Sequence, residues 1–193
     1  AAAGVKFGER LPLMVMLHGC GQDAKTFAAS TRMNVVAARE RFLVLYPEQD
    51  RLSNTNGCWN WFETRSGRAQ GEAALIMAAI GQVCVLYAAD RDRVAVAGLS
   101  SGASMAALLG TRHPERFTSV TMHSGVAPGA ANSTLSAVGA MQGRRTPAPL
   151  PVSANTAAVA CPMRSRWKNS GSNADAWNTR ASGISSATSR ARS

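Results

Sequence analysis

The stretch VAVAGLSSGASM, Val94 to Met105, joins two apolar runs through the pentad Gly-Leu-Ser-Ser-Gly. The residues before the pentad are typical of a buried strand, and the small apolar residues after it are typical of a helix. A serine flanked by glycines at ±2 on such a strand-to-helix turn is the pattern of a nucleophile elbow, because only small neighbours let the chain bend so sharply. The pattern makes Ser100 a candidate nucleophile. The alternative is that Ser100 only caps the helix that follows.

Strand-like and helix-like segments alternate on both sides of this stretch. Buried strands are expected at Leu11–Gly19 and Phe42–Pro47, and further strands at Arg93–Gly98 and Phe117–Gly125. Helices are expected at Asp23–Phe42, Gly71–Tyr87, Ser100–His113 and Ser133–Gly143, with Asp23 as the first N-cap. This alternation predicts an α/β fold with a mostly parallel sheet and helices on both faces. The groups that follow the strand ends should then share one edge of the sheet.

The periodic pattern stops near residue 146. We therefore expect a partial domain over 1–146, whose sheet is truncated at its C-terminal end, and a tail over 147–193. The tail is polar and basic, rich in Ser, Ala and Arg, and has few branched aliphatic residues. Such a composition predicts a disordered or non-native segment, because it offers too little apolar surface to form a core.

The charge balance raises one further class of partner. The 193 residues carry 21 Lys and Arg against 11 Asp and Glu, a net charge of +10, which is compatible with a basic protein that binds polyanions. Much of this surplus lies in the tail, where Trp167 and Trp177 are the only aromatic residues. Because single-strand binders interleave aromatic and basic side chains, nucleic acid is not the expected partner.

The cysteines point to packing and cross-linking rather than to a metal. The sequence has no CxxC and no histidine pair at ligand spacing, so we expect no metal and no cofactor. Cys84 falls in an apolar helical pattern and is expected to be a buried thiol. Cys20 and Cys58 each follow a strand and could meet at one end of the sheet, either as a disulfide in an oxidising compartment or as free thiols.

No membrane segment or leader is expected from the sequence. No apolar run reaches about 18–20 residues without a charge or glycine. The chain begins Ala-Ala-Ala-Gly, with no basic, apolar leader, and a mature secreted chain would begin in the same way.

A second motif, LHGCGQ at Leu17–Gln22, supplies what an acyl-transfer site needs beside its nucleophile. The developing oxyanion is usually stabilised by two converging backbone N–H groups. The amide of Ser101, at the start of the helix, is one candidate donor, and the amide of Cys20 in this turn is the other. A plain strand-ending turn is the alternative.

Six motifs in one order resemble the polyhydroxybutyrate depolymerase-like esterase family. They are LPLMVMLHGCGQDAKTFAASTRMN, FLVLYPEQ, CWNWF, GEAALI, VAVAGLSSGASMAALL and SVTMHSGVAPGAA, spread over about two thirds of the chain. The resemblance implies a secreted serine esterase of α/β-hydrolase fold, acting on polyesters or on aryl and acyl esters. By the same resemblance Ser100 matches the nucleophile, and Cys20 and Ser101 match the oxyanion donors. Trp59 is then a candidate for substrate contact, unless it only plugs its loop against the sheet.

The family pattern is incomplete where a base is needed. In this fold an acid and then a histidine follow the serine along the chain. After Ser100 the sequence offers only His113, His123, Glu115 and Asp175, and none stands in the family's context for an acid or a base. Two alternatives to an active esterase therefore stay open, a catalytically impaired relative and a basic protein that binds polyanions.

Overall fold

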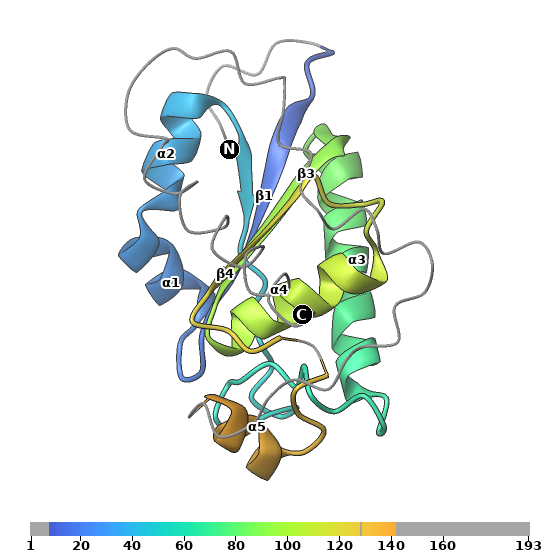
Figure 1. The fold of residues 1–193 in the computed structure, drawn as a ribbon. Helices are drawn as coiled ribbons and strands as arrows, with labels where there is room; N and C mark the ends of the chain where they lie inside the picture. The colour runs from blue at the N-terminus through green and yellow to red at the C-terminus, as the bar shows by residue number, and fades with distance from the viewer. Residues whose placement is uncertain (1–7, 128, 142–193) are drawn as a thin grey trace, which may run out of the picture. The chain divides into compact units, whose positions relative to one another are not determined.

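A computed structural model describes residues 8–127 and 129–141. Its elements in chain order are β1 (Leu11–Leu17), α1 (Ala24–Thr31), α2 (Met33–Glu40), β2 (Leu43–Leu45), α3 (Arg68–Leu86), β3 (Ala89–Leu99), α4 (Ser101–Arg112), β4 (Ser119–His123) and α5 (Thr134–Met141) (Figure 1). The predicted tail over 147–193, which contains Asp175, lies outside the described residues.

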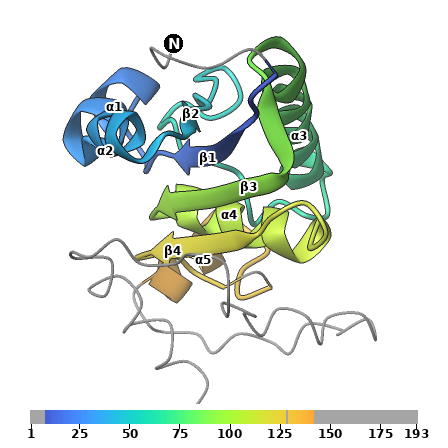
Figure 2. The same cartoon turned by 90° about the horizontal axis from the view of Figure 1, so that it is seen from above.

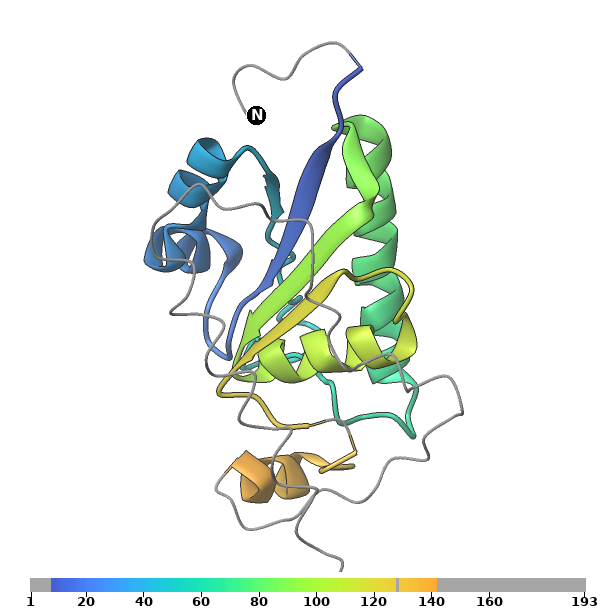
Figure 3. The same cartoon turned by 45° about the horizontal axis from the view of Figure 1, so that its top comes forward.

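The strands form one parallel sheet in the order β2-β1-β3-β4. Figure 2 shows β1, β3 and β4 running in the same direction, so that their carboxyl ends gather at one edge. Helices α3 and α4 lie together on one side of the strands, and α1 and α2 lie on the other (Figures 1 and 3). The predicted parallel sheet with helices on both faces is confirmed.

The main core lies between the sheet and the pair α3 and α4. It is built from the strand residues Leu13, Val15, Leu17, Val94 and Val96 and from the helix residues Ile76, Ile80, Met105 and Leu109, all at most 3% exposed. Full burial of each large aliphatic side chain contributes about 1.5–3 kcal/mol. This packing fixes the start of α4, and with it the turn that carries Ser100.

Two predicted elements differ in the structure. The single helix expected over Asp23–Phe42 is wrong, because the chain breaks at Arg32 (φ 53°) into α1 and α2. The strand expected to be buried over Phe42–Pro47 is only the short, half-buried β2. Within the described part of the chain β2 pairs with β1 alone, so it is an edge strand with one side open.

Helix α3 begins three residues before the start that the sequence pattern predicted, at Arg68, and it is strongly apolar. It has 19 residues with a mean hydropathy of 1.5, so by length and composition alone it could cross a membrane. One face, however, is buried in the domain core through Ala69, Ala73, Ile76, Ile80 and Cys84. That packing accounts for part of its apolar character, whereas Leu75, Val85 and Leu86 on the same helix are exposed. Cys84 is a free, buried thiol, as predicted.

The N-cap of α1 gives a pH-dependent prediction. Asp23 Oδ1 accepts a hydrogen bond from Thr26 N at 2.6 Å, and this bond lowers the pKa of Asp23 from 3.8. A depressed folded-state pKa means that the stabilisation is complete above the unfolded-state value and is lost as the pH falls through the folded-state value. The Asp23→Ala variant should therefore melt a few degrees below the wild type at pH 6. The difference in Tm should shrink at pH 3, and a difference that is equal at both pH values would contradict the capping role.

Candidate active site

Ser100 lies on the sharp turn between β3 and α4, at the carboxyl edge of the sheet. Its backbone has φ 55° and ψ −118°, a conformation that costs a non-glycine residue about 1–3 kcal/mol and persists only where neighbours enforce it. Two hydrogen bonds hold the turn. Ser100 N donates to His123 O at 2.9 Å, and Ser104 N donates to Ser100 O at 3.1 Å. The half-exposed Ser100 is thus presented at the end of the strand.

The two glycines of the pentad explain how the turn closes. A Cβ on Gly98 would lie 2.3 Å from the backbone of Gly102, and a Cβ on Gly102 would lie 2.3 Å from Leu17 O and 2.5 Å from His18 O. Strand β3, helix α4 and the end of β1 therefore meet backbone to backbone. At both positions only glycine fits without a backbone clash, as the sequence pattern predicted.

The two candidate oxyanion donors lie beside this turn. Ser101 is the first residue of α4, and Cys20 lies in the turn after β1, where Gln22 N donates to Gly19 O at 3.3 Å. Ser101 Oγ is 3.3 Å from Cys20 Sγ, and because this sulfur carries no proton, the hydroxyl is the donor. Among residues 8–127 and 129–141, neither the Cys20 N–H nor the Ser101 N–H has a hydrogen-bond acceptor. As far as the described residues are concerned, both amides are free to bind an anion.

A disulfide joins the Cys20 turn to the loop after β2. Cys20 and Cys58 form a disulfide bond, with their Cα atoms 4.2 Å apart. Of the two alternatives that the sequence left open, a disulfide and a pair of free thiols, the structure has the disulfide. Gly21 N also donates to Asn56 O at 2.9 Å. One of the candidate oxyanion donors is therefore fixed to a segment 38 residues away in the chain.

Trp59 lies inside the domain, behind the Cys20 turn. It is 3% exposed, its Nε1 donates to His18 O at 3.0 Å, and its ring centroid is 5.3 Å from that of His18. Trp61 and Phe62 are buried as well and pack edge to face. Of the two roles that the sequence left open for Trp59, this geometry favours support of the loop over contact with a substrate.

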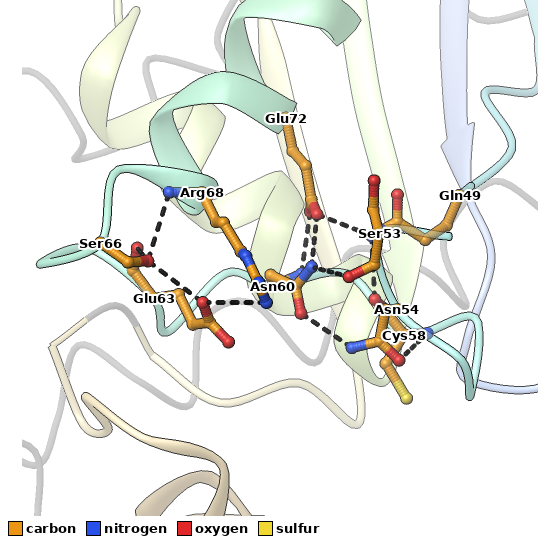
Figure 4. Close-up of polar contacts among 9 residues, drawn as sticks. All are labelled: Gln49, Ser53, Asn54, Cys58, Asn60, Glu63, Ser66, Arg68 and Glu72. Carbon is orange, nitrogen blue, oxygen red and sulfur yellow. Dashed lines mark hydrogen bonds and ion pairs between the residues drawn. The ribbon is translucent and has the colours of Figure 1, made fainter. Parts of the chain in front are cut away.

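A buried polar network, which the sequence analysis missed, holds the loop that carries Cys58 (Figure 4). Glu72 on α3 is 8% exposed, and its carboxylate is the centre of the network. It accepts hydrogen bonds from Gln49 Nε2 at 2.7 Å, Asn60 N at 2.8 Å and Asn60 Nδ2 at 2.6 Å. Asn54 Nδ2 donates to Asn60 Oδ1 at 2.7 Å. Bonds to a buried carboxylate are strong, so this network makes the loop rigid.

None of the histidines is placed as a base for Ser100 in the described part of the chain. His18 is buried and bonded to Gly19 and Gln49. His123 Nδ1 lies 3.1 Å from Ser124 Oγ, and His113 caps the far end of α4. Across residues 8–127 and 129–141, no hydrogen bond joins a histidine to Ser100 Oγ or to a carboxylate. The same residues contain no group of three or more His, Cys, Asp or Glu side chains that could hold a metal.

The disulfide should contribute strongly to stability. Replacing both Cys20 and Cys58 with alanine opens a loop with a sequence separation of 38, and the chain-entropy account gives a loss of about 4 kcal/mol in the free energy of unfolding. Urea unfolding measures this loss. Reductant should lower the midpoint of the wild type and leave that of the double variant unchanged. A wild-type midpoint that is insensitive to reductant would contradict the role of the cross-link.

Comparisons with known proteins agree with this fold and identify the family. Poly(3-hydroxyalkanoate) depolymerase C of Paucimonas lemoignei is 38% identical over 107 residues, which are 55% of this chain and 26% of that protein. Feruloyl esterase B of Neurospora crassa is 33% identical over 135 residues, which are 67% of this chain and 45% of that protein. The chain therefore spans less than half the length of either relative.

Among solved structures, an acetyl xylan esterase from Aspergillus awamori superposes with a TM-score of 0.55 at 24% identity, over 66% of this chain and 46% of that one. This likeness supports the α/β-hydrolase type of fold. The family model described as Esterase PHB depolymerase matches residues 2–167, most of the chain. Together with the order of its motifs, this match shows that the protein belongs to the esterase PHB depolymerase family.

Proposed function

We propose that the protein is a serine-dependent carboxylic ester hydrolase that forms an acyl-enzyme at Ser100. One observation carries the proposal. Ser100 is held on a strained turn beside two backbone amides, those of Cys20 and Ser101, that have no acceptor among the described residues. A protein has little reason to keep a strained serine and two free donors together unless an anion forms there.

The geometry supports the following chemistry. Ser100 Oγ attacks the ester carbonyl carbon, and its proton passes to a base that no histidine of residues 8–127 and 129–141 supplies. The carbonyl oxygen becomes an oxyanion that accepts hydrogen bonds from the Cys20 and Ser101 N–H groups. Collapse breaks the ester bond, and the leaving alkoxide takes the proton. Water then hydrolyses the acyl-enzyme. In this proposal Ser100 is the nucleophile. The backbone amides of Cys20 and Ser101 stabilise the transition state of its attack on the ester.

A catalytically impaired relative is the second candidate. It is favoured by the histidines, none of which reaches Ser100 within the described residues. Without a base, the oxyanion donors and substrate binding alone would still leave a residual rate above that in water. Binding of polyanions by the basic tail is a third candidate function. It depends on residues 147–193, which lie outside the part of the chain that the structure describes.

The names of the relatives support a proposal for the substrate class. Their names refer to poly(3-hydroxyalkanoate), feruloyl and acetylxylan esters, so we propose hydroxyacid polyesters or aryl and acyl esters as substrates. An extracellular location is supported by the Cys20–Cys58 disulfide, since such bonds persist in oxidising compartments.

The test is hydrolysis of p-nitrophenyl butyrate and of a soluble 3-hydroxybutyrate oligomer by the 193-residue chain. Hydrolysis that depends on Ser100 would support an active esterase. A rate near the uncatalysed one, with Ser100 still open to acylation, would favour the impaired relative. Hydrolysis that is undiminished without Ser100 would contradict both.

A further inference from the structure

The side chain of His18 lies directly behind the candidate oxyanion turn. His18 follows β1 and is 0% exposed. Its ring contacts the indole of Trp59 with centroids 5.3 Å apart, and its carbonyl oxygen accepts from Trp59 Nε1. A buried imidazole with both ring nitrogens in short polar contacts is fixed in orientation, and each contact restricts where its proton can be.

The partners of the ring select one tautomer. Gln49 N lies 3.1 Å from His18 Nε2, and a backbone N–H can only donate, so Nε2 must be the unprotonated acceptor. The ring proton is then on Nδ1, which lies 2.8 Å from Gly19 O, an acceptor. The neutral Nδ1–H form satisfies both contacts. The Nε2–H form would set a donor against a donor at Gln49 and leave Gly19 O without the ring bond.

The contact with Gly19 O matters because of the geometry of the peptide bond. Gly19 C=O and Cys20 N–H belong to one planar, trans peptide unit and point in opposite directions. Whatever holds the carbonyl toward the interior therefore points the amide away from it. Gly19 lacks a Cβ, so without an anchor this peptide can rotate at low cost. The His18 Nδ1–H bond, together with the turn bond from Gln22 N at 3.3 Å, supplies that anchor.

The donor to His18 is in turn fixed from helix α3. Gln49 is 7% exposed, and its side-chain Nε2 donates to Glu72 Oε1 at 2.7 Å and to Cys58 O at 3.0 Å. Asp50 N donates back to Gln49 Oε1 at 3.1 Å. The backbone of Gln49 is thereby held in place, and with it the N–H that sets the tautomer of His18.

We propose that His18 is a positioning residue, whose neutral Nδ1–H tautomer holds the Gly19 carbonyl and so aims the Cys20 amide at the oxyanion. This inference rests on the proposed function of Ser100, which it deepens. His18 touches no substrate and transfers no proton. It acts through the Gly19–Cys20 peptide, and Glu72 and Gln49 keep it in the form that can do so.

The first arm of the test needs no activity. Long-range ¹H–¹⁵N NMR of the ¹⁵N-histidine-labelled wild-type chain at pH 7.5 distinguishes the two tautomers by the chemical shifts of the ring nitrogens. His18 should show a protonated Nδ1 and an unprotonated Nε2. A protonated Nε2 would overturn the proposal, because the ring would then not be in the neutral Nδ1–H form.

The second arm uses a matched pair of variants. His18→Phe keeps a ring of similar size and removes both polar contacts, whereas His18→Asn places an amide N–H near the position of Nδ1. Loss of one oxyanion donor costs about 10²–10³-fold in kcat. His18→Phe should therefore lower kcat for p-nitrophenyl butyrate by about 10²-fold with little change in KM, and His18→Asn should recover most of that loss.

The outcomes separate this inference from the proposed function. Equal kcat values for the wild type and His18→Phe, both dependent on Ser100, would overturn the positioning role and leave the proposed function intact. Equal losses in His18→Phe and His18→Asn would also overturn it, since the Nδ1-type donor would then not matter. Wild-type hydrolysis that does not depend on Ser100 would overturn the proposed function, and the tautomer would still be decided by the NMR arm.

Discussion

Replacing Gly98 with alanine is expected to prevent the domain from folding stably. The added Cβ would lie 2.3 Å from both C and O of Gly102 and 2.6 Å from Ala103 N. These are backbone atoms at the start of α4, so no side chain can rotate to relieve the overlap. Overpacking of a core commonly costs 1–3 kcal/mol, and a clash with fixed backbone should cost about 3 kcal/mol or more. Urea unfolding followed by circular dichroism measures the loss.

Gly81→Ala is the matched control for this variant. Gly81 lies within α3, and nothing lies within 4 Å of the Cβ that alanine would add there. Alanine favours a helix over glycine by about 0.8–1 kcal/mol, so this variant should be as stable as the wild type or slightly more so. A Gly98→Ala chain that unfolds at the wild-type midpoint would mean that β3 and α4 do not meet as described.

Replacing Ser100 with alanine should remove catalysis without removing the fold. Loss of the nucleophile leaves only the oxyanion donors and substrate binding, and the rate of an active esterase should fall by at least about 10³-fold in kcat. Stability should hardly change, because alanine at this position has the same positive φ as serine. Initial rates with p-nitrophenyl butyrate measure the loss of catalysis, and the thermal midpoint measures the change in stability.

Ser101→Ala is the control within the same pentad. It keeps the backbone amide and removes only the hydroxyl that contacts Cys20 Sγ at 3.3 Å, so kcat should stay within a few-fold of the wild type. If Ser101→Ala abolished activity and Ser100→Ala did not, the nucleophile would have been assigned to the wrong serine.

The parts of the fold that were predicted correctly have local causes. The turn at Ser100 could be recognised because its glycines are required by backbone contacts that any such turn has. Asp23 could be recognised as an N-cap because a cap depends on the next three residues alone. The break at Arg32 could not be found, since the pattern of apolar residues continues across it.

The support of the site depends on contacts between distant segments. One feature of the sequence indicates that Glu72 is buried, because its carboxylate lies on the apolar face of α3 that also holds Ala69 and Ala73. Its partners Gln49 and Asn60, however, lie in the loop before the helix and cannot be found from that pattern. The tautomer of His18 is set by Gln49 N–H, 31 residues away in the chain. Such pairings follow from the packed fold and have no periodic signature in the sequence.

The central claim is that Ser100 is the residue that receives an acyl group. The most direct measurement is mass spectrometry of the 193-residue chain after reaction with a fluorophosphonate, which modifies activated serines. We expect a single adduct on the peptide that carries Ser100, and no adduct in the Ser100→Ala variant. No adduct on the wild-type chain, or an adduct on another serine, would contradict it.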